Sequence, residues 1–425
     1  MELRTLADAE RYLEEFLNLE RTQTFDYERL GLARITALLD ALGHPERGLP
    51  CVHIAGSKGK GSVALMLECL LRAGGQSVGT YTSPHLESWC ERFRIGGVPI
   101  EGKRLAATLQ ALQPALERLR QDPLLCPSFF DVCTALALQL FRDCAVDVGV
   151  IEVGLGGRLD STNVVEPRVS VLTSVQLEHT DKLGSTLEQI ALEKAGILRA
   201  QVPLLHGVLA PEALAAVMAR AVAENTVLEE VRLAHVELEE TGLWLGLVDG
   251  RVIRAPLCGR HQAANLALAI RAAECFLERS LTAGELARLE SLRLPARIER
   301  FGDVILDCAH SPDSARALRE ALQALWPERP WQLVVSISRD KDAAGILYEL
   351  ASPTRAAVIS RAEPLRSQNP DALVPLARAA GIETVETCAD PAEALKRARE
   401  ALQPGELLVV TGSVYLAGAV RPLLT

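Results

Sequence analysis

The stretch that decides the fold is HIAGSKGKGS, residues 53–62, which overlaps the end of an apolar run at 51–55 that predicts a buried strand. Glycines let a backbone approach an anion closely, and the N-terminus of a following helix adds partial positive charge. The ammonium group of Lys60 can neutralise a phosphate, and the hydroxyl of Ser62 can reach a magnesium ion. In α/β proteins such a loop lies at the carboxyl end of a parallel strand. The stretch therefore predicts a parallel sheet with a nucleoside triphosphate bound at this loop.

The spacing of this loop differs from that of the common P-loop. In the common pattern four residues separate two glycines, and a lysine and a Ser or Thr follow directly. Here two residues separate Gly56 from Gly59, and Gly61 stands between Lys60 and Ser62. A glycine turn without a ligand is the alternative interpretation. The apolar strand before the loop and the apolar-faced helix after it favour the phosphate site.

Strands and helices alternate along most of the chain. Nearly continuous apolar runs predict strands at 51–55, 77–83, 146–154, 168–175 and 201–208, and helical spacing predicts helices at 62–75, 129–141, 186–199 and 260–277. The first 50 residues are also predicted to be helical. This alternation is typical of a parallel sheet covered by helices on both faces. Residues 226–256 are more polar and favour an antiparallel patch or flap.

A turn-rich stretch at 291–295 marks the expected domain boundary. After it strands and helices alternate again, which predicts a second and smaller α/β domain of common size. We therefore expect an α/β fold in two parts. Residues 1–293 form a P-loop-type parallel sheet with flanking helices, and residues 294–425 form a smaller Rossmann-like domain.

Composition argues against several classes of protein. The chain of 425 residues has a formal net charge of −10 and no basic stripe, which disfavours nucleic-acid binding. Its ten cysteines stand singly, which indicates reduced core cysteines in a cytoplasmic protein. The charged N-terminus does not resemble a secretory signal, and no apolar run of membrane-spanning length lacks charges. We expect small-molecule partners only, no nucleic acid and no membrane, with a monomer as the simplest state.

Further motifs follow the loop in a fixed order. They are TSPHLESWCERFRIGG at 82–97, VIEVGLGGRLDSTNVV at 150–165, LEHTDKLGSTLEQIALEKAGI at 177–197, GRHQAAN at 259–265, LPARIE at 294–299, DCAHSPD at 307–313, SRDKD at 338–342 and TGSVYL at 411–416. Together they resemble the folylpolyglutamate synthase and dihydrofolate synthase family of the Mur ligase superfamily. The resemblance spans nearly the whole chain.

This resemblance implies a reaction. Family members use ATP to join a folate or dihydropteroate carboxylate to the amine of L-glutamate through an acyl phosphate. Residues 1–293 would then be the ATP-binding, Mur ligase central-type domain, and residues 294–425 the glutamate-ligase-type domain. ATP is expected between them, with its phosphates on the loop of Gly56, Gly59, Lys60, Gly61 and Ser62.

The resemblance also implies magnesium. Besides Ser62, the positions of Ser83, Glu152 and His179 match the family's metal ligands. Oxygen ligands suit this hard cation, whereas a histidine is a less usual ligand. The alternatives are a strand-end Glu152 in a salt bridge and an ordinary loop histidine.

Lys194 matches a lysine that is carbamylated in the family. Carbamylation turns a cation into an anion, which would support a second magnesium ion. The alternative is a surface lysine that pairs with Glu188 or Glu193 on its own helix. The resemblance assigns catalytic roles to Lys60, Glu152, His179 and Lys194.

Nucleotide contacts are implied for Asn265 at the adenine, and for Arg297 and Asp307 at the phosphate and ribose. A planar guanidinium such as that of Arg297 suits phosphate oxygens. Its alternative role is a surface pair with Glu299. Lys341 is expected in the same cleft.

Substrate contacts are implied for five residues. Phe129 and Phe130 are expected to stack on a flat heterocycle, and Asp131 to accept from its ring N–H groups. Core packing is an equal alternative for one of the two phenylalanines. His310 and Ser413 are expected to hold the incoming glutamate.

Four positions depart from the usual family pattern or vary within it. Glu178 replaces the usual Asp before the histidine, and Cys308 and Ser311 stand in a motif that usually reads D-G-A-H-N-P. Ser311 cannot copy the hydrogen bonding of an amide. Lys58 stands where many members have Asn, although lysine also occurs there.

Three other functions stay open. A Mur-type ligase acting on another carboxylate would share the fold, the loop and the metal. The departures give some weight to a nucleotide-binding paralogue without ligase activity. The third possibility is a simple nucleoside triphosphatase.

Overall fold

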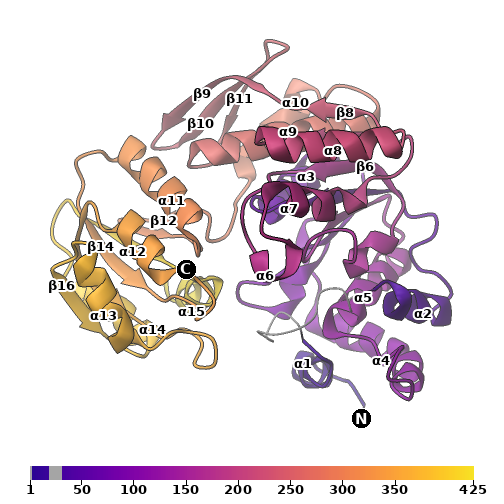
Figure 1. Cartoon of the computed structure of the whole chain (residues 1–425), viewed down its shortest axis with the longest axis horizontal. Helices are drawn as coiled ribbons and strands as arrows, with labels where there is room; N and C mark the ends of the chain where they lie inside the picture. Colours follow the sequence, from indigo (N-terminus) through magenta and orange to yellow (C-terminus); the bar gives the residue numbers. More distant parts are fainter. Residues whose placement is uncertain (1, 19–30) are drawn as a thin grey trace. The chain divides into compact units, whose positions relative to one another are not determined.

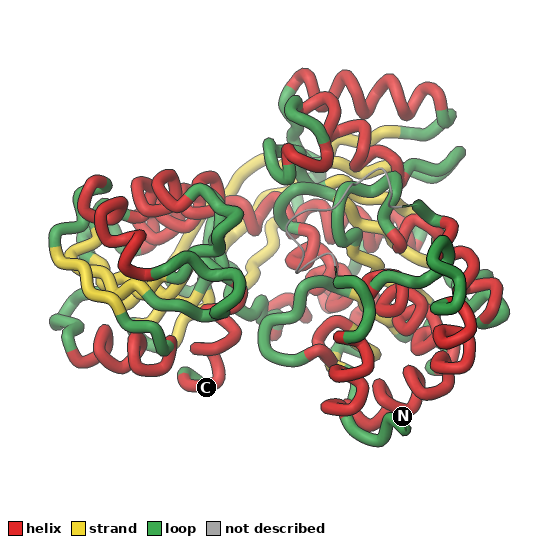
Figure 2. The backbone as a smooth tube through the Cα atoms, turned by 60° about the horizontal axis from the view of Figure 1, so that its bottom comes forward, coloured by secondary structure: helices red, strands yellow, loops and turns green. Residues whose placement is uncertain are grey.

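Two sheets with mostly parallel strands carry the fold, one in each of two compact units. The structure is a computed structural model that describes residues 2–18 and 31–425. The first unit comprises Met1–Ala234, Gly246–Ile253 and Ala264–Leu292, and the second His235–Leu245, Arg254–Ala263 and Arg293–Thr425. Figure 1 shows the elements of each unit, and Figure 2 shows helices on both sides of the strands of the second unit.

The sheet of the first unit has eight strands in the order β4-β3-β2-β5-β1-β6-β7-β8. Their bounds are β1 Cys51–Ala55, β2 Val78–Tyr81, β3 Phe93–Ile95, β4 Val98–Pro99, β5 Val148–Glu152, β6 Pro167–Leu172, β7 Leu204–His206 and β8 Leu228–Glu230. The six strands from β2 to β8 pair in parallel, and β3 and β4 add an antiparallel edge. All residues of β1 and β5 are buried, as expected for central strands covered on both faces.

Helices cover this sheet. The bounds are α1 Leu6–Glu14, α2 Ala33–Ala41, α3 Lys60–Ala73, α4 Gly102–Leu119, α5 Phe129–Asp143, α6 Thr180–Leu183, α7 Leu187–Lys194, α8 Pro211–Ala223, α9 Arg260–Leu277 and α10 Ala283–Ala287. Two separate groups of buried apolar side chains fill the spaces around the sheet. One of them packs α1, α2, α4 and α5 together, and the other packs α7 and α8.

The second unit repeats the plan on a smaller scale. Its six strands have the order β12-β13-β17-β14-β15-β16, and only β12 is antiparallel to its neighbour. The bounds are β12 Glu299–Phe301, β13 Val304–Leu306, β14 Trp331–Val335, β15 Thr354–Ile359, β16 Thr384–Thr387 and β17 Leu407–Thr411, with α11 Pro312–Leu325, α12 Ala343–Leu350, α13 Pro370–Ala379, α14 Pro391–Glu400 and α15 Val414–Val420.

The structure confirms the expected α/β fold and refines it. Of the predicted helical N-terminus, α1 and α2 are observed, and residues 19–30 lie outside the described part. The helix predicted at 186–199 ends at Lys194 and continues as a short 3-10 turn, Ala195–Ile197. The polar stretch at 226–256 divides: β8 joins the large sheet, and β9 Leu233–Glu239, β10 Gly242–Leu247 and β11 Val252–Ala255 form a separate three-stranded sheet.

None of the described helices is both long and apolar enough to cross a membrane. All ten cysteines are free thiols.

Candidate functional site

The phosphate loop, defined here as residues 56–62, connects β1 to α3. Gly59 caps α3 with a φ of 88°, and Gly56 has a φ of 147°, so both occupy backbone conformations that favour glycine. A Cβ at Gly56 would lie 1.9 Å from Oγ1 of Thr173, and one at Gly59 would lie 2.4 Å from Oδ1 of Asn265. These two positions therefore require glycine both for the backbone and for space. The contact also brings Asn265, on α9, against the phosphate loop.

The Glu152 carboxylate lies beside the first turn of α3. The strand pairing of β1 with β5 puts Glu152 opposite Ile54, at the carboxyl end of the sheet. A Cβ placed on Gly61 would be 3.5 Å from Oε2 of Glu152. The same oxygen accepts a hydrogen bond of 3.0 Å from the backbone N–H of Ser83. Three predicted site residues, Gly61, Ser83 and Glu152, are thus brought together.

The oxygen atoms of Glu152, Ser62 and Ser83 are suitable ligands for a magnesium ion. The carboxylate of Glu152 is only 4% exposed, and hydroxyl oxygens of Ser62 and Ser83 lie on neighbouring segments. Within residues 2–18 and 31–425 no group of three or more His, Cys, Asp or Glu side chains could hold a metal by itself. The set predicted here has one carboxylate, one histidine and hydroxyls, so oxygens of a bound phosphate or of water would have to complete it.

His179 is the N-cap residue of α6 and has a left-handed conformation with a φ of 48°. Its backbone carbonyl accepts hydrogen bonds of 2.9 Å from the N–H groups of Lys182 and Leu183. This geometry fixes the backbone of the segment between β6 and α7. The metal role of the side chain stays a prediction.

Lys194 is a buried lysine, not the surface lysine of the alternative interpretation. It is 2% exposed, and its ammonium group lies 3.3 Å from Oε1 of Glu178. Burial lowers the pKa of Lys194 to about 8, although Glu178 acts in the opposite direction. Burial alone would raise the pKa of Glu178, but Lys194, Lys58, Lys60 and His179 together lower it to about 2.

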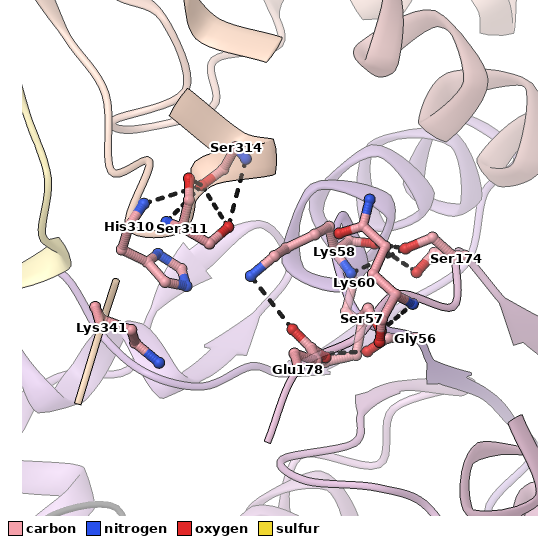
Figure 3. A network of polar contacts seen from close by, with 12 residues as sticks. Gly56, Ser57, Lys58, Lys60, Ser174, Glu178, His310, Ser311, Ser314 and Lys341 are labelled. Atoms are coloured by element: carbon pink, nitrogen blue, oxygen red, sulfur yellow. Dashed lines mark hydrogen bonds and ion pairs between the residues drawn. The ribbon is translucent and has the colours of Figure 1, made fainter. Parts of the chain in front are cut away.

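Glu178 also pairs with the phosphate loop. Its second oxygen, Oε2, lies 3.3 Å from the ammonium group of Lys58, a contact drawn in Figure 3. The ammonium group of Lys60 donates 2.9 Å to the carbonyl of Gly56 within the same loop. Three lysines therefore gather around one carboxylate, which makes this region locally cationic on a chain of net negative charge.

The segment after β6 holds the start of the phosphate loop through both side-chain and backbone hydrogen bonds (Figure 3). The hydroxyl of Thr173 donates a hydrogen bond of 2.6 Å to the backbone carbonyl of Lys58. The backbone N–H of Lys58 donates a hydrogen bond of 3.0 Å to Oγ of Ser174. The N–H of Ser57 donates 2.8 Å to the carbonyl of Ser174, and Oγ of Ser57 accepts 2.9 Å from the N–H of Gln176. The loop is thus a preformed structure.

The segment predicted to line the heterocycle has mixed roles. Phe129 is fully buried and packs edge to face with Trp89, which matches the core alternative for one of the two phenylalanines. Phe130 is partly exposed, and its ring packs where a side chain on Gly154 would stand. One oxygen of the Asp131 carboxylate accepts hydrogen bonds from Ser128, the N-cap residue of α5, and the other accepts a hydrogen bond of 2.5 Å from the hydroxyl of Ser161. Both oxygens therefore already have partners.

In the second unit, Asp307 and Arg297 lie on adjoining segments at the carboxyl end of β13. Asp307 is 7% exposed and accepts hydrogen bonds from the N–H groups of Ile298 and Ala309 at 2.9 and 2.7 Å. Burial raises the pKa of Asp307, and Arg297 opposes this shift. The guanidinium of Arg297 donates to the sulfur of Cys308, so this departure from the family motif contacts a predicted phosphate residue.

The remaining predicted residues of this unit occupy helix starts and loops. Ser311 caps α11 and shares a capping box with Ser314 (Figure 3). Nδ1 of His310 lies 2.9 Å from the carbonyl oxygen of Cys308. Ser413 is buried and caps α15. Lys341 pairs with Asp340 at 3.0 Å.

Sequence reasoning missed two polar networks. The first is the Thr173 and Ser174 pair, whose signal was two hydroxyl residues directly after an apolar strand. The second joins His53 on β1 to the loop after β5: Nε2 of His53 lies 2.9 Å from Oγ1 of Thr162, which donates 2.5 Å to Asp160. In the sequence His53 is part of an apolar strand, and no neighbouring residue indicates that it contacts Thr162.

Comparisons with known proteins define the class first. A family profile described as "Mur ligase, glutamate ligase domain" matches residues 296–414. With a phosphate loop in the first unit and this domain in the second, the chain has the organisation of a Mur-type ligase.

The particular family follows from full-length relatives. The chain is 32% identical to dihydrofolate synthase/folylpolyglutamate synthase of Bacillus subtilis, with 93% of this chain and 95% of the relative covered. It is 35% identical to the Mycobacterium tuberculosis protein of the same name, with 92% and 89% covered. The chain belongs to the folylpolyglutamate synthase and dihydrofolate synthase family.

Solved structures agree. Mycobacterium tuberculosis folylpolyglutamate synthase complexed with ADP and AMPPCP matches with a TM-score of 0.91 and 33% identity, over 100% of this chain and 99% of the other. Escherichia coli FolC in complex with DHPP and ADP matches with a TM-score of 0.85 and 29% identity, over 99% and 97%.

Proposed function

We propose that this protein is an ATP-dependent ligase that adds L-glutamate to the carboxylate of a folate or of dihydropteroate. The observation that carries the proposal is the Glu152 carboxylate beside the phosphate loop, 3.5 Å from the position of a Cβ on Gly61. Family membership and the nucleotide complexes of related structures support it. We also propose the division into an ATP-binding domain at 1–293 and a glutamate-ligase domain at 294–425.

The reaction proceeds in two steps. A carboxylate oxygen of the folate substrate attacks the γ-phosphorus of ATP, and ADP leaves. The glutamate nitrogen then attacks the acyl carbon, phosphate leaves, and the nitrogen loses a proton. The backbone N–H groups of Gly59–Ser62 and the ammonium of Lys60 hold the triphosphate and offset its charge.

Magnesium would be held by Glu152 with Ser62, Ser83 and His179, and when bound it would neutralise phosphate charge. Lys194 is buried beside Glu178, and its lowered pKa makes the neutral amine that carbamylation requires more accessible. We keep this modification as a proposal. Arg297, Asp307, His310, Lys341 and Ser413 stay predicted contributors to nucleotide and glutamate binding.

Of the residues proposed at the heterocycle, Phe130 is the best candidate for stacking because it is partly exposed. Phe129 and Asp131 have structural partners that explain them without a ligand. Asn265 stays the predicted adenine contact, and its side chain lies against Gly59 of the phosphate loop. We also propose a monomeric, cytoplasmic enzyme without nucleic-acid or membrane partners. The acidic net charge supports the absence of nucleic acid, and the free cysteines support the cytoplasm.

The test is ADP release with dihydropteroate plus L-glutamate, and with a reduced folate plus L-glutamate. Release that requires both the acceptor carboxylate and the amine supports the proposal. ATP binding without turnover on either pair would identify a non-catalytic paralogue, and turnover without amine a triphosphatase. Lys60→Ala should reduce turnover at least a hundredfold with the fold retained, and full activity would contradict the role of the loop.

A further inference from the structure

The proposed reaction does not explain why Glu178 forms ion pairs with two lysines. Its two carboxylate oxygens each take one lysine from a different segment: Oε1 lies 3.3 Å from Lys194, at the end of α7, and Oε2 lies 3.3 Å from Lys58, in the phosphate loop. The side chain of Glu178 is 16% exposed, that of Lys58 29% and that of Lys194 2%. These are not solvent-screened surface pairs, so loss of a partner has a measurable consequence.

The Lys58 pair adds to a set of backbone contacts in one place. Thr173 and Ser174 hold the carbonyl and N–H of Lys58, and Ser174 also holds the N–H of Ser57. All of these partners come from the segment that follows β6, and Glu178 lies further along it. The side chain of Lys58 is therefore tied to the segment that already holds its backbone, two residues before α3 begins at Lys60.

The Glu178 carboxylate places a negative charge beside a loop that is proposed to bind phosphates. A carboxylate close to a loop that receives phosphates repels them, and in simple electrostatic terms its removal should tighten anion binding. A carboxylate that fixes the loop conformation has the opposite effect, because preorganised N–H donors bind an anion without a reorganisation cost. The two effects differ in sign, so they can be separated.

We infer that Glu178 is a positioning residue for nucleotide binding, which clamps the phosphate loop through Lys58 and links it to α7 through Lys194. The inference rests on the proposed nucleotide site. It assigns Glu178 no contact with substrate or with the reacting atoms. Its effect on the nucleotide passes through the conformation of residues 56–62.

The experiment measures the affinity for ADP in the presence of EDTA, so that no metal contributes. Four proteins form a double-mutant cycle: wild type, Glu178→Gln, Lys58→Met and the double variant. Glu178→Gln should weaken ADP binding about tenfold in the wild-type background, despite the lost negative charge. In the Lys58→Met background the same change should leave ADP affinity unchanged or increase it. Glu188→Gln, an exposed carboxylate on α7, is the matched control and should change nothing.

Two results would overturn the inference. Tighter ADP binding by Glu178→Gln in both backgrounds would mean that the residue acts only by its charge. Equal weakening in both would mean that it acts through Lys194 or the fold, and not through Lys58. If Glu178→Gln does not fold, Glu178→Asp gives the answer. It keeps the charge but is one methylene too short to span both lysines, so it should weaken ADP binding where a charge effect predicts no change.

A second readout does not depend on nucleotide. Amide hydrogen exchange of residues 56–62 in the free protein should be faster in Glu178→Gln than in wild type, and unchanged in Glu188→Gln. If wild type fails to bind ADP, the proposed function fails, while this exchange measurement still tests the clamp. Unchanged exchange in Glu178→Gln would contradict it.

Discussion

Replacing Lys194 with methionine should leave the protein at least as stable and yet inactive. The reason is the burial of an ammonium group that is only 2% exposed. Lowering the pKa of Lys194 from 10.5 to about 8, with the attraction of Glu178 included, corresponds to a net cost of about 3 kcal/mol for the charged form at neutral pH. Methionine fills a similar volume without that cost.

The sign depends on what happens to Glu178. When one partner of a buried pair is removed, the remaining charge usually costs about 3–5 kcal/mol. Here Glu178 keeps Lys58 at 3.3 Å, so it is not left alone. We therefore expect Lys194→Met to have an unfolding free energy between that of wild type and about 3 kcal/mol above it.

The assay is urea unfolding at pH 7 in buffer depleted of carbon dioxide, which keeps the lysine as an amine. Ligase turnover is then measured in bicarbonate buffer, where Lys194→Met should be reduced at least a hundredfold. Lys103→Met, at an exposed position on α4, is the control and should match wild type in both assays. A variant destabilised by about 3 kcal/mol or more but with normal turnover would identify Lys194 as a structural residue and refute the reasoning.

Two further predictions concern the loop and the strand before it. Gly59→Ala places a side chain at a φ of 88° and 2.4 Å from Oδ1 of Asn265, so ADP affinity should fall at least tenfold. Wild-type ADP affinity of this variant would contradict the prediction. Burial lowers the pKa of His53 to about 3 from 6.5, so the unfolded chain binds one more proton between these values. The unfolding free energy should therefore fall by about 1.4 kcal/mol per pH unit as the pH drops from 6.5 towards 3. The measurement is urea unfolding of wild type and His53→Gln at several pH values. The slope of the unfolding free energy against pH should be smaller in His53→Gln by about 1.4 kcal/mol per pH unit, the contribution of one proton. An unchanged slope would show that another group is responsible.

The sequence predicts the first unit well where one local pattern decides the structure. The apolar run before Gly56 and the helical spacing after Lys60 depend on neighbours in the chain, so β1, α3 and the loop between them could be predicted. The position of Glu152 also followed, because parallel strands bring their carboxyl ends to one edge of a sheet.

Contacts between distant segments could not be predicted in the same way. Lys58 and Glu178 each stand out against the family pattern, but the sequence does not predict their pairing, because it depends on where the segment after β6 turns. The family resemblance implies a ligand role for Asp131, and its hydrogen bond to Ser161, 30 residues away in the chain, could not be predicted from neighbouring residues. Phe129 and Phe130 are adjacent in sequence, and only the packing shows which of them is buried.

The most direct test of the central claim is a crystal structure of this protein with a non-hydrolysable ATP analogue and Mg²⁺. We predict the terminal phosphates at the N–H groups of Gly59–Ser62, with a cation in contact with both the phosphates and the carboxylate of Glu152. A nucleotide bound elsewhere, or a cation that Glu152 does not touch, would contradict the account.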